Sequence, residues 1–221
     1  MQNENLSKFM SKTYGYMFLA LLITGVGILA TIRLVGVLMI SLPAILAVIA
    51  VQFLLIFLIG RQVNDEHASM AKSLTLLIGF ALLEGVILSP IIALTSITTL
   101  TMALTSTVVL FAVLAIFGLT TKRDLSKFGS VLTSLLITLI IVSIIGLFFV
   151  NVPMVSLVIS YISIIIFSGF VLYDNKMLKD RYQNSNGENL DAVAVSGALN
   201  LYLDFINLFI DFIRIFTSWD N

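Results

Sequence analysis

Cysteine is absent from this chain of 221 residues, and histidine occurs once, at His67. A chain without cysteine can form no disulfide, no thiolate metal site and no cysteine nucleophile. A single histidine likewise excludes a multi-histidine metal or haem centre. These two absences remove thiol chemistry and histidine-based metal chemistry from the functions open to the chain.

Charged residues are also scarce. They make up 11% of the chain, whereas 59% of the residues are hydrophobic and the mean hydropathy is +1.11. A soluble domain usually has about 25% charged residues, because its surface faces water. We therefore predict an integral membrane protein. The net charge is zero, which gives no basic surface for nucleic acid.

Long apolar runs fill the sequence. A membrane-spanning helix needs roughly 20 mostly apolar residues, and its backbone groups are satisfied within the helix. We predict an all-α integral membrane protein with one domain over residues 1–221 and a cytoplasmic N-terminal tail at 1–13. The seven predicted spans are Tyr14–Thr31, Val37–Gly60, Leu74–Thr95, Thr99–Leu119, Ser130–Val150, Met154–Leu178 and Ala192–Phe216.

The basic residues predict the orientation of the helices. Ten of the twelve lysines and arginines fall in the N-terminal tail and in alternate connections, while Arg33 and Arg214 fall on the opposite side. Cytoplasmic loops carry the excess of such residues. We therefore expect a cytoplasmic N-terminus and, with seven spans, an outer C-terminus. The ten are Lys8, Lys12, Arg61, Lys72, Lys122, Arg123, Lys127, Lys176, Lys179 and Arg181.

Polar residues recur along one face of the seventh predicted helix. Their spacing of 4, 3, 4, 3 and 4 residues places them within an arc of roughly 80°. A charge at the bilayer centre costs at least about 2.5–3.5 kcal/mol, so this face should point into the bundle and line a pathway. The alternative is a hydrogen-bonded seam with Asp211 paired to Arg214. The six residues are Asn200, Asp204, Asn207, Asp211, Arg214 and Ser218.

Two acids are predicted at similar depths. Counted from the outer ends of their helices at about 1.5 Å per residue, Asp174 lies some 31 Å in and Asp204 about 22 Å in. A contact is feasible within the slack allowed by tilt. Such a pair would share a proton at lower pH and bind a divalent cation at higher pH. The alternative is that Asp174 is an interfacial residue neutralised by Lys176 and Lys179.

Glu84 lies halfway along the third predicted helix. An acid at that depth must be protonated, paired or hydrated, so Glu84 is a candidate for the pathway lining. The alternative is a protonated carboxyl group that is hydrogen-bonded to a neighbouring helix.

Several segments resemble the Bax inhibitor family (transmembrane Bax inhibitor motif proteins), as in bacterial members. They are ALNLYLDFINLF with the downstream Arg214, LYDNKML on the preceding helix, FALLEGVILSPI on the third helix and the KRDLSKFGS loop. The resemblance spans nearly the whole chain. It implies a fold in which six helices surround a central seventh helix with the polar stripe.

The resemblance also implies a function, which is a pH-sensitive calcium leak across a membrane. By motif, Asp174 and Asp204 become the pH-sensing pair and the calcium-binding acids, and Arg61 becomes an arginine that latches onto one of them. The chain departs from the family pattern at Gln52, where some bacterial relatives have an acid nearby, and at Glu84 and Asp211.

Three classes of function follow from these observations. The first is a calcium or cation leak channel gated by protonation of Asp174 and Asp204. The second is a regulator of another membrane protein, such as a protease or a stress-response component. The third is a proton-coupled cation antiporter. Asn200, Asn207, Asp211 and Glu84 would line the pathway.

Catalysis is not expected. The chain has the YD of intramembrane aspartyl proteases at Tyr173–Asp174 but no GxGD. We expect no cofactor, with calcium bound or transported as an ion. The expected partners are the lipid bilayer, calcium ions and protons, and a possible membrane protein, but no nucleic acid. The lack of a targeting extension favours the plasma membrane of a prokaryote.

Overall fold

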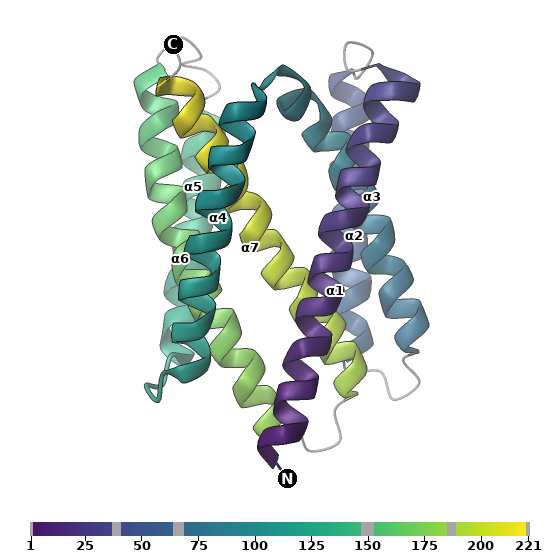
Figure 1. Ribbon diagram of the computed structural model, residues 1–221, viewed down its shortest axis with the longest axis vertical. Helices are drawn as coiled ribbons and strands as arrows, with labels where there is room; N and C mark the ends of the chain where they lie inside the picture. Colours follow the sequence, from purple (N-terminus) through teal and green to yellow (C-terminus); the bar gives the residue numbers. More distant parts are fainter. Residues whose placement is uncertain (1, 37–40, 64–68, 147–152, 185–188, 220–221) are drawn as a thin grey trace. The chain divides into compact units, whose positions relative to one another are not determined.

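A computed structural model describes residues 2–36, 41–63, 69–146, 153–184 and 189–219. These residues form seven α-helices, and the first ends in a short π-helical segment, η1 (Figure 1). His67 lies outside the described residues. The elements are α1 (Gln2–Ala30), η1 (Thr31–Val35), α2 (Leu42–Val63), α3 (Met70–Leu94), α4 (Ile97–Thr120), α5 (Ser126–Gly146), α6 (Pro153–Gln183) and α7 (Leu190–Trp219).

Each predicted span corresponds to one of these helices, and all seven are long and apolar enough to cross a membrane. The seven-helix all-α prediction is therefore confirmed. The main difference is at the N-terminus, where α1 starts at Gln2 rather than at Tyr14. The polar start of the chain continues the helix because Phe9 and Met10 are buried, and the Phe9 ring packs 5.0 Å from Tyr182.

The chain divides into two compact units. The first unit holds residues Met1–Leu94 and Arg181–Tyr202, and the second holds Thr95–Asp180 and Leu203–Asn221. Helix α7 therefore contributes its first part to one unit and its second part to the other. The expectation of a single membrane domain stays a prediction.

In the first unit, α1 and α3 meet backbone to backbone. A Cβ atom built on Gly85 would lie 2.6 Å from the Thr24 carbonyl oxygen and 2.7 Å from the Gly27 Cα. This approach requires glycine at both positions, because a side chain at either one would hold the helices apart. The beginning of α7 joins the same contact, since the Tyr202 hydroxyl lies 2.7 Å from Thr24 Oγ1.

In the second unit, α4 and α6 are packed as closely. A Cβ on Gly118 of α4 would lie 2.5 Å from the Leu172 carbonyl oxygen of α6. The ring of Phe205 on α7 packs edge-to-face against Phe111 of α4, with centroids 5.7 Å apart. These contacts place the second part of α7 among α4 and α6, which positions its polar face.

Exposure along the helices separates α7 from the others. In the most apolar stretch of α7, 67% of the residues are buried, against 11–33% in the other six helices. The exposed side chains of α5 include many large apolar ones, such as Leu135, Ile140 and Ile144. Such surfaces are stable in lipid rather than in water. The helix with the polar face is thus the one that contacts lipid least.

The close contact of α1 and α3 generates a test. We expect Gly85→Ala to lower the stability of the folded protein by about 1–3 kcal/mol, because the new methyl group overlaps backbone atoms that cannot rotate away. Gly79→Ala is the matched control on the same helix, since its Cβ would meet nothing closer than 3.9 Å. Thermal unfolding of the purified protein in detergent measures both, and equal midpoints would refute the backbone contact.

Candidate functional site

The polar face predicted on α7 is buried only in part, since Asn200 and Arg214 are exposed. Asp204 and Asp211 are buried, with 4% and 2% of their surfaces exposed, and Asn207 is half-buried. Asn200 is exposed and belongs to the part of α7 in the first unit. In the second unit the two acids therefore point away from solvent, as the cost of placing a charge in lipid requires.

Asp174 and Asp204 are brought together in the second unit. The two carboxyl groups interact electrostatically, one from α6 and the other from α7. Asp174 is half-buried, while Oδ2 of Asp204 is fully buried and has no hydrogen-bond partner among the described residues. The acids of two helices therefore act on each other electrostatically, and one Asp204 oxygen is still able to accept a hydrogen bond.

The neighbouring lysines have other partners. Lys176 forms an ion pair with Asp180 one turn along α6. Lys179 donates from Nζ to the Leu119 carbonyl oxygen at 2.7 Å. These contacts argue against the alternative in which both lysines neutralise Asp174, because their ammonium groups are already hydrogen-bonded elsewhere.

Asp211 has a different environment. Its Oδ1 lies 3.3 Å from Nη1 of Arg214 in the same helix, which confirms the pairing considered from the sequence. The Ser163 hydroxyl on α6 interacts with the same carboxyl group. The Ser160 hydroxyl also lies near it, but in a geometry that leaves Ser160 Oγ without a hydrogen-bond partner among the described residues. Asp211 thus faces a cation on one side and hydroxyls on the other.

Glu84 is held in the first unit by a neighbouring helix. Its Oε2 accepts a hydrogen bond of 2.6 Å from Nε2 of Gln52 on α2. Gln52 is buried, with 6% of its surface exposed. This contact is the inter-helix hydrogen bond considered from the sequence, so a neighbouring helix holds the Glu84 carboxyl group. Its role as a lining residue stays a prediction.

Arg61 lies in the last turn of α2 in the first unit. Its side chain is exposed, and the guanidinium carbon lies 5.9 Å from the centroid of the Phe57 ring. A cation over an aromatic face is attracted to the ring. Because the proposed acids belong to the second unit, the latch between Arg61 and one of them stays a prediction.

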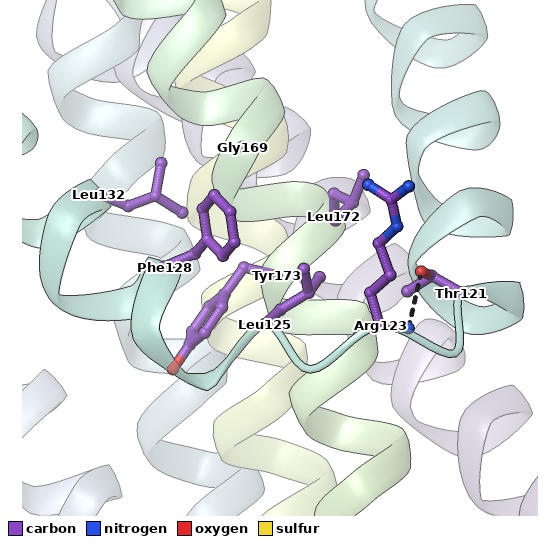
Figure 2. Close-up of a pocket in the computed structure, with 8 residues that line it drawn as sticks. All are labelled: Thr121, Arg123, Leu125, Phe128, Leu132, Gly169, Leu172 and Tyr173. Carbon is purple, nitrogen blue, oxygen red and sulfur yellow. Dashed lines mark hydrogen bonds between the residues drawn. The ribbon is translucent and has the colours of Figure 1, made fainter.

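A pocket of about 430 Å³ lies in the second unit, between α5, α6 and the connection that precedes α5. Figure 2 shows leucine and aromatic side chains around it, with the ring of Tyr173 from α6 and the Arg123 side chain from the connection before α5. Asp174 follows Tyr173 directly but is not among the lining residues. The pocket is mostly apolar, so it does not supply ligands for a cation.

A multi-acid metal centre is not present in the described ranges, where no three acidic or histidine side chains gather closely enough to hold a metal ion. The calcium site predicted at Asp174 and Asp204 would therefore offer two carboxylates and no third. Calcium takes six to eight oxygen ligands. Such a site would complete its coordination shell with water, which suits passage of the ion better than tight retention.

Sequence reasoning missed the serines of α6. Ser160 and Ser163 are buried among apolar residues and carry no charge, so neither stood out. Their spacing of three residues on the helix before the polar stripe is the signal that could have found them. Gln52 was noted only as a departure from the family pattern, although it is the partner of Glu84.

Comparison with known proteins shows which family this chain resembles. A family model described as "Inhibitor of apoptosis-promoting Bax1" matches residues 6–221. Inner membrane protein YbhL of Escherichia coli is 30% identical over 207 residues, which is 91% of this chain and 87% of YbhL. A protein of Borreliella burgdorferi is 32% identical over 205 residues, covering 90% of this chain and 87% of that protein.

A shorter and more similar stretch is shared with an uncharacterised membrane protein of Streptococcus pyogenes. It is 47% identical over 89 residues, which is 40% of this chain and 38% of the streptococcal protein. The family match, by contrast, covers almost every residue of the chain. This multi-pass membrane protein therefore belongs to the Bax inhibitor family.

Proposed function

We propose that the chain is a pH-sensitive cation pathway that leaks calcium across the membrane and is gated by Asp174 and Asp204. One observation carries the proposal: two acids from different helices interact electrostatically, and the buried Asp204 has an Oδ2 with no hydrogen-bond partner among the described residues. A structural role alone would favour a satisfied carboxyl group. An oxygen without a partner suits a site that exchanges protons or cations.

The proposed gate works through the charge of the pair. When both carboxyl groups are ionised they repel each other and attract a cation. When one takes up a proton, the pair is held by a shared hydrogen bond and binds the cation less tightly. We propose that this change releases Arg61 and raises the flux. Asn207, Asp211 and Glu84 would line the route, together with Asn200.

The proposal extends to orientation and chemistry. We propose that the protein lies in the plasma membrane of a prokaryote with its N-terminus in the cytoplasm. The name of the relative, inner membrane protein YbhL, supports the membrane but says nothing of the termini. We propose no enzymatic activity and no cofactor. The partners would be lipid, protons and calcium.

Calcium flux into proteoliposomes tests the gate. Between about pH 6 and pH 8 we expect the flux of the unmodified protein to change several-fold and to be higher at the lower pH, because protonation neutralises the pair. Asp204→Asn and Asp174→Asn should each remove this pH dependence, since an amide carries no charge at either pH.

Asp124→Asn is the matched control. Asp124 is exposed before α5, and hydrogen bonds from Ser126 hold its pKa below the usual range, so it stays ionised from pH 6 to pH 8. This variant should keep the pH profile. If folded protein passes no calcium at any pH, the leak proposal is refuted. That result would favour the hypothesis that the chain regulates another membrane protein. Flux that requires a proton gradient would favour an antiporter instead.

The orientation can be tested with single cysteines, because the chain has none of its own. Ser69→Cys precedes α3, and Thr98→Cys lies at the start of α4; both positions are exposed. We expect a membrane-impermeant maleimide to label Thr98→Cys in intact cells and Ser69→Cys only after the cells are opened, as the basic loops predict. The reverse pattern would show that the orientation is wrong.

A further inference from the structure

The surroundings of Asp211 differ from those of the Asp174–Asp204 pair. We propose that Asp211, Ser160 and Ser163 form a separate binding site for a small monovalent cation such as Na⁺, and that Arg214 occupies this site as a tethered cation until the ion displaces it. Every residue of the site belongs to the second unit, on α6 and α7. The proposal concerns binding, so it stands whether or not the protein conducts calcium.

The oxygen ligands come from two adjacent helices. Asp211 supplies a carboxyl group with 2% of its residue surface exposed, and the Ser163 hydroxyl of α6 interacts with it. A hydroxyl that donates its hydrogen still has lone pairs for a cation. Hard cations prefer such oxygen atoms to nitrogen or sulfur.

The Ser160 hydroxyl is the second observation that indicates a ligand. Ser160 is completely buried, and its Oγ has no hydrogen-bond partner among the described residues, although it lies near the Asp211 carboxyl group. A buried hydroxyl without a hydrogen-bond partner destabilises the folded protein, so such groups are rare in native structures. Where one occurs, a bound ion or water molecule is a common partner. A cation between Asp211 and Ser160 would satisfy this oxygen.

The charges of Asp211 and Arg214 favour a monovalent ion over a divalent one. Asp211 forms an ion pair with Arg214, and this pairing neutralises one negative charge with one positive charge. The Arg214 side chain is 52% exposed, so it can turn away from Asp211 without losing a buried position. A monovalent ion would replace the guanidinium charge one for one. A divalent ion would leave an extra buried positive charge, which is costly.

The site is distinct from the acidic pair along α7. Asp211 follows Asp204 by two turns, which at 1.5 Å per residue is about 10 Å. Neither Asp174 nor Asp204 is among the groups that act on the Asp211 carboxyl. The two sites can therefore be disabled separately.

Thermal unfolding of the full-length protein in detergent, with NaCl exchanged for choline chloride at constant ionic strength, tests the proposal. We expect Na⁺ at about ten times its Kd to raise the midpoint by roughly 3–5 °C, because an ion that binds only the folded state stabilises it. Asp211→Asn should abolish the shift, and Asp204→Asn should keep it.

The serine and arginine variants test the details. Ser160→Ala should weaken the apparent affinity for Na⁺ several-fold, whereas Ser168→Ala, a serine of the same helix outside the surroundings of Asp211, should leave it unchanged. Arg214→Gln should strengthen the affinity, because the competing cation is gone. An equal shift in choline, a shift that survives in Asp211→Asn, or no shift at all would overturn the site. Unchanged or weaker binding in Arg214→Gln would overturn the exchange with Arg214.

Discussion

The cost of placing charged groups in lipid is the constraint on which the rest of this structure depends. Helix α7 carries two buried acids, Asp204 and Asp211, on a face whose other side is mostly apolar. Neither acid can face hydrocarbon, so α7 must be covered by other helices along this face. The surface that contacts lipid is then formed by helices such as α5, whose exposed side chains include many leucines, isoleucines and valines. The distribution of polar groups thus decides which helix is buried.

The two buried acids of α7 have different neighbours. Asp204 faces a second acid and keeps an oxygen without a partner in the described part of the chain. Asp211 is balanced by Arg214 and hydroxyl groups. A repelling pair responds to its protonation state, whereas a balanced acid responds to exchange of its counter-ion. The two buried acids of this helix face therefore have different electrostatic surroundings.

The number of helices and their membrane-spanning character could be predicted from the sequence. The hydropathy of a segment shows directly whether it is stable in lipid or in water. It also identified Asp174 and Asp204, since an acid in an apolar helix stands out. It did not reveal the partners. Gln52 and Ser160 became important only through what lies opposite them on another helix, and one sequence carries no record of such pairings. The start of α1 at Gln2 depends likewise on tertiary packing around Phe9.

The glycine contact between α1 and α3 has a mechanical consequence. Flexible side chains normally allow two helices to slide by small repacking steps. At Gly27 and Gly85 there is only backbone between the helices, and sliding would drive one main chain into the other. The two helices must therefore move as a single rigid body. A rearrangement inside the first unit would then involve the elements outside this glycine contact, among them α2, the helix that carries Gln52 and Arg61.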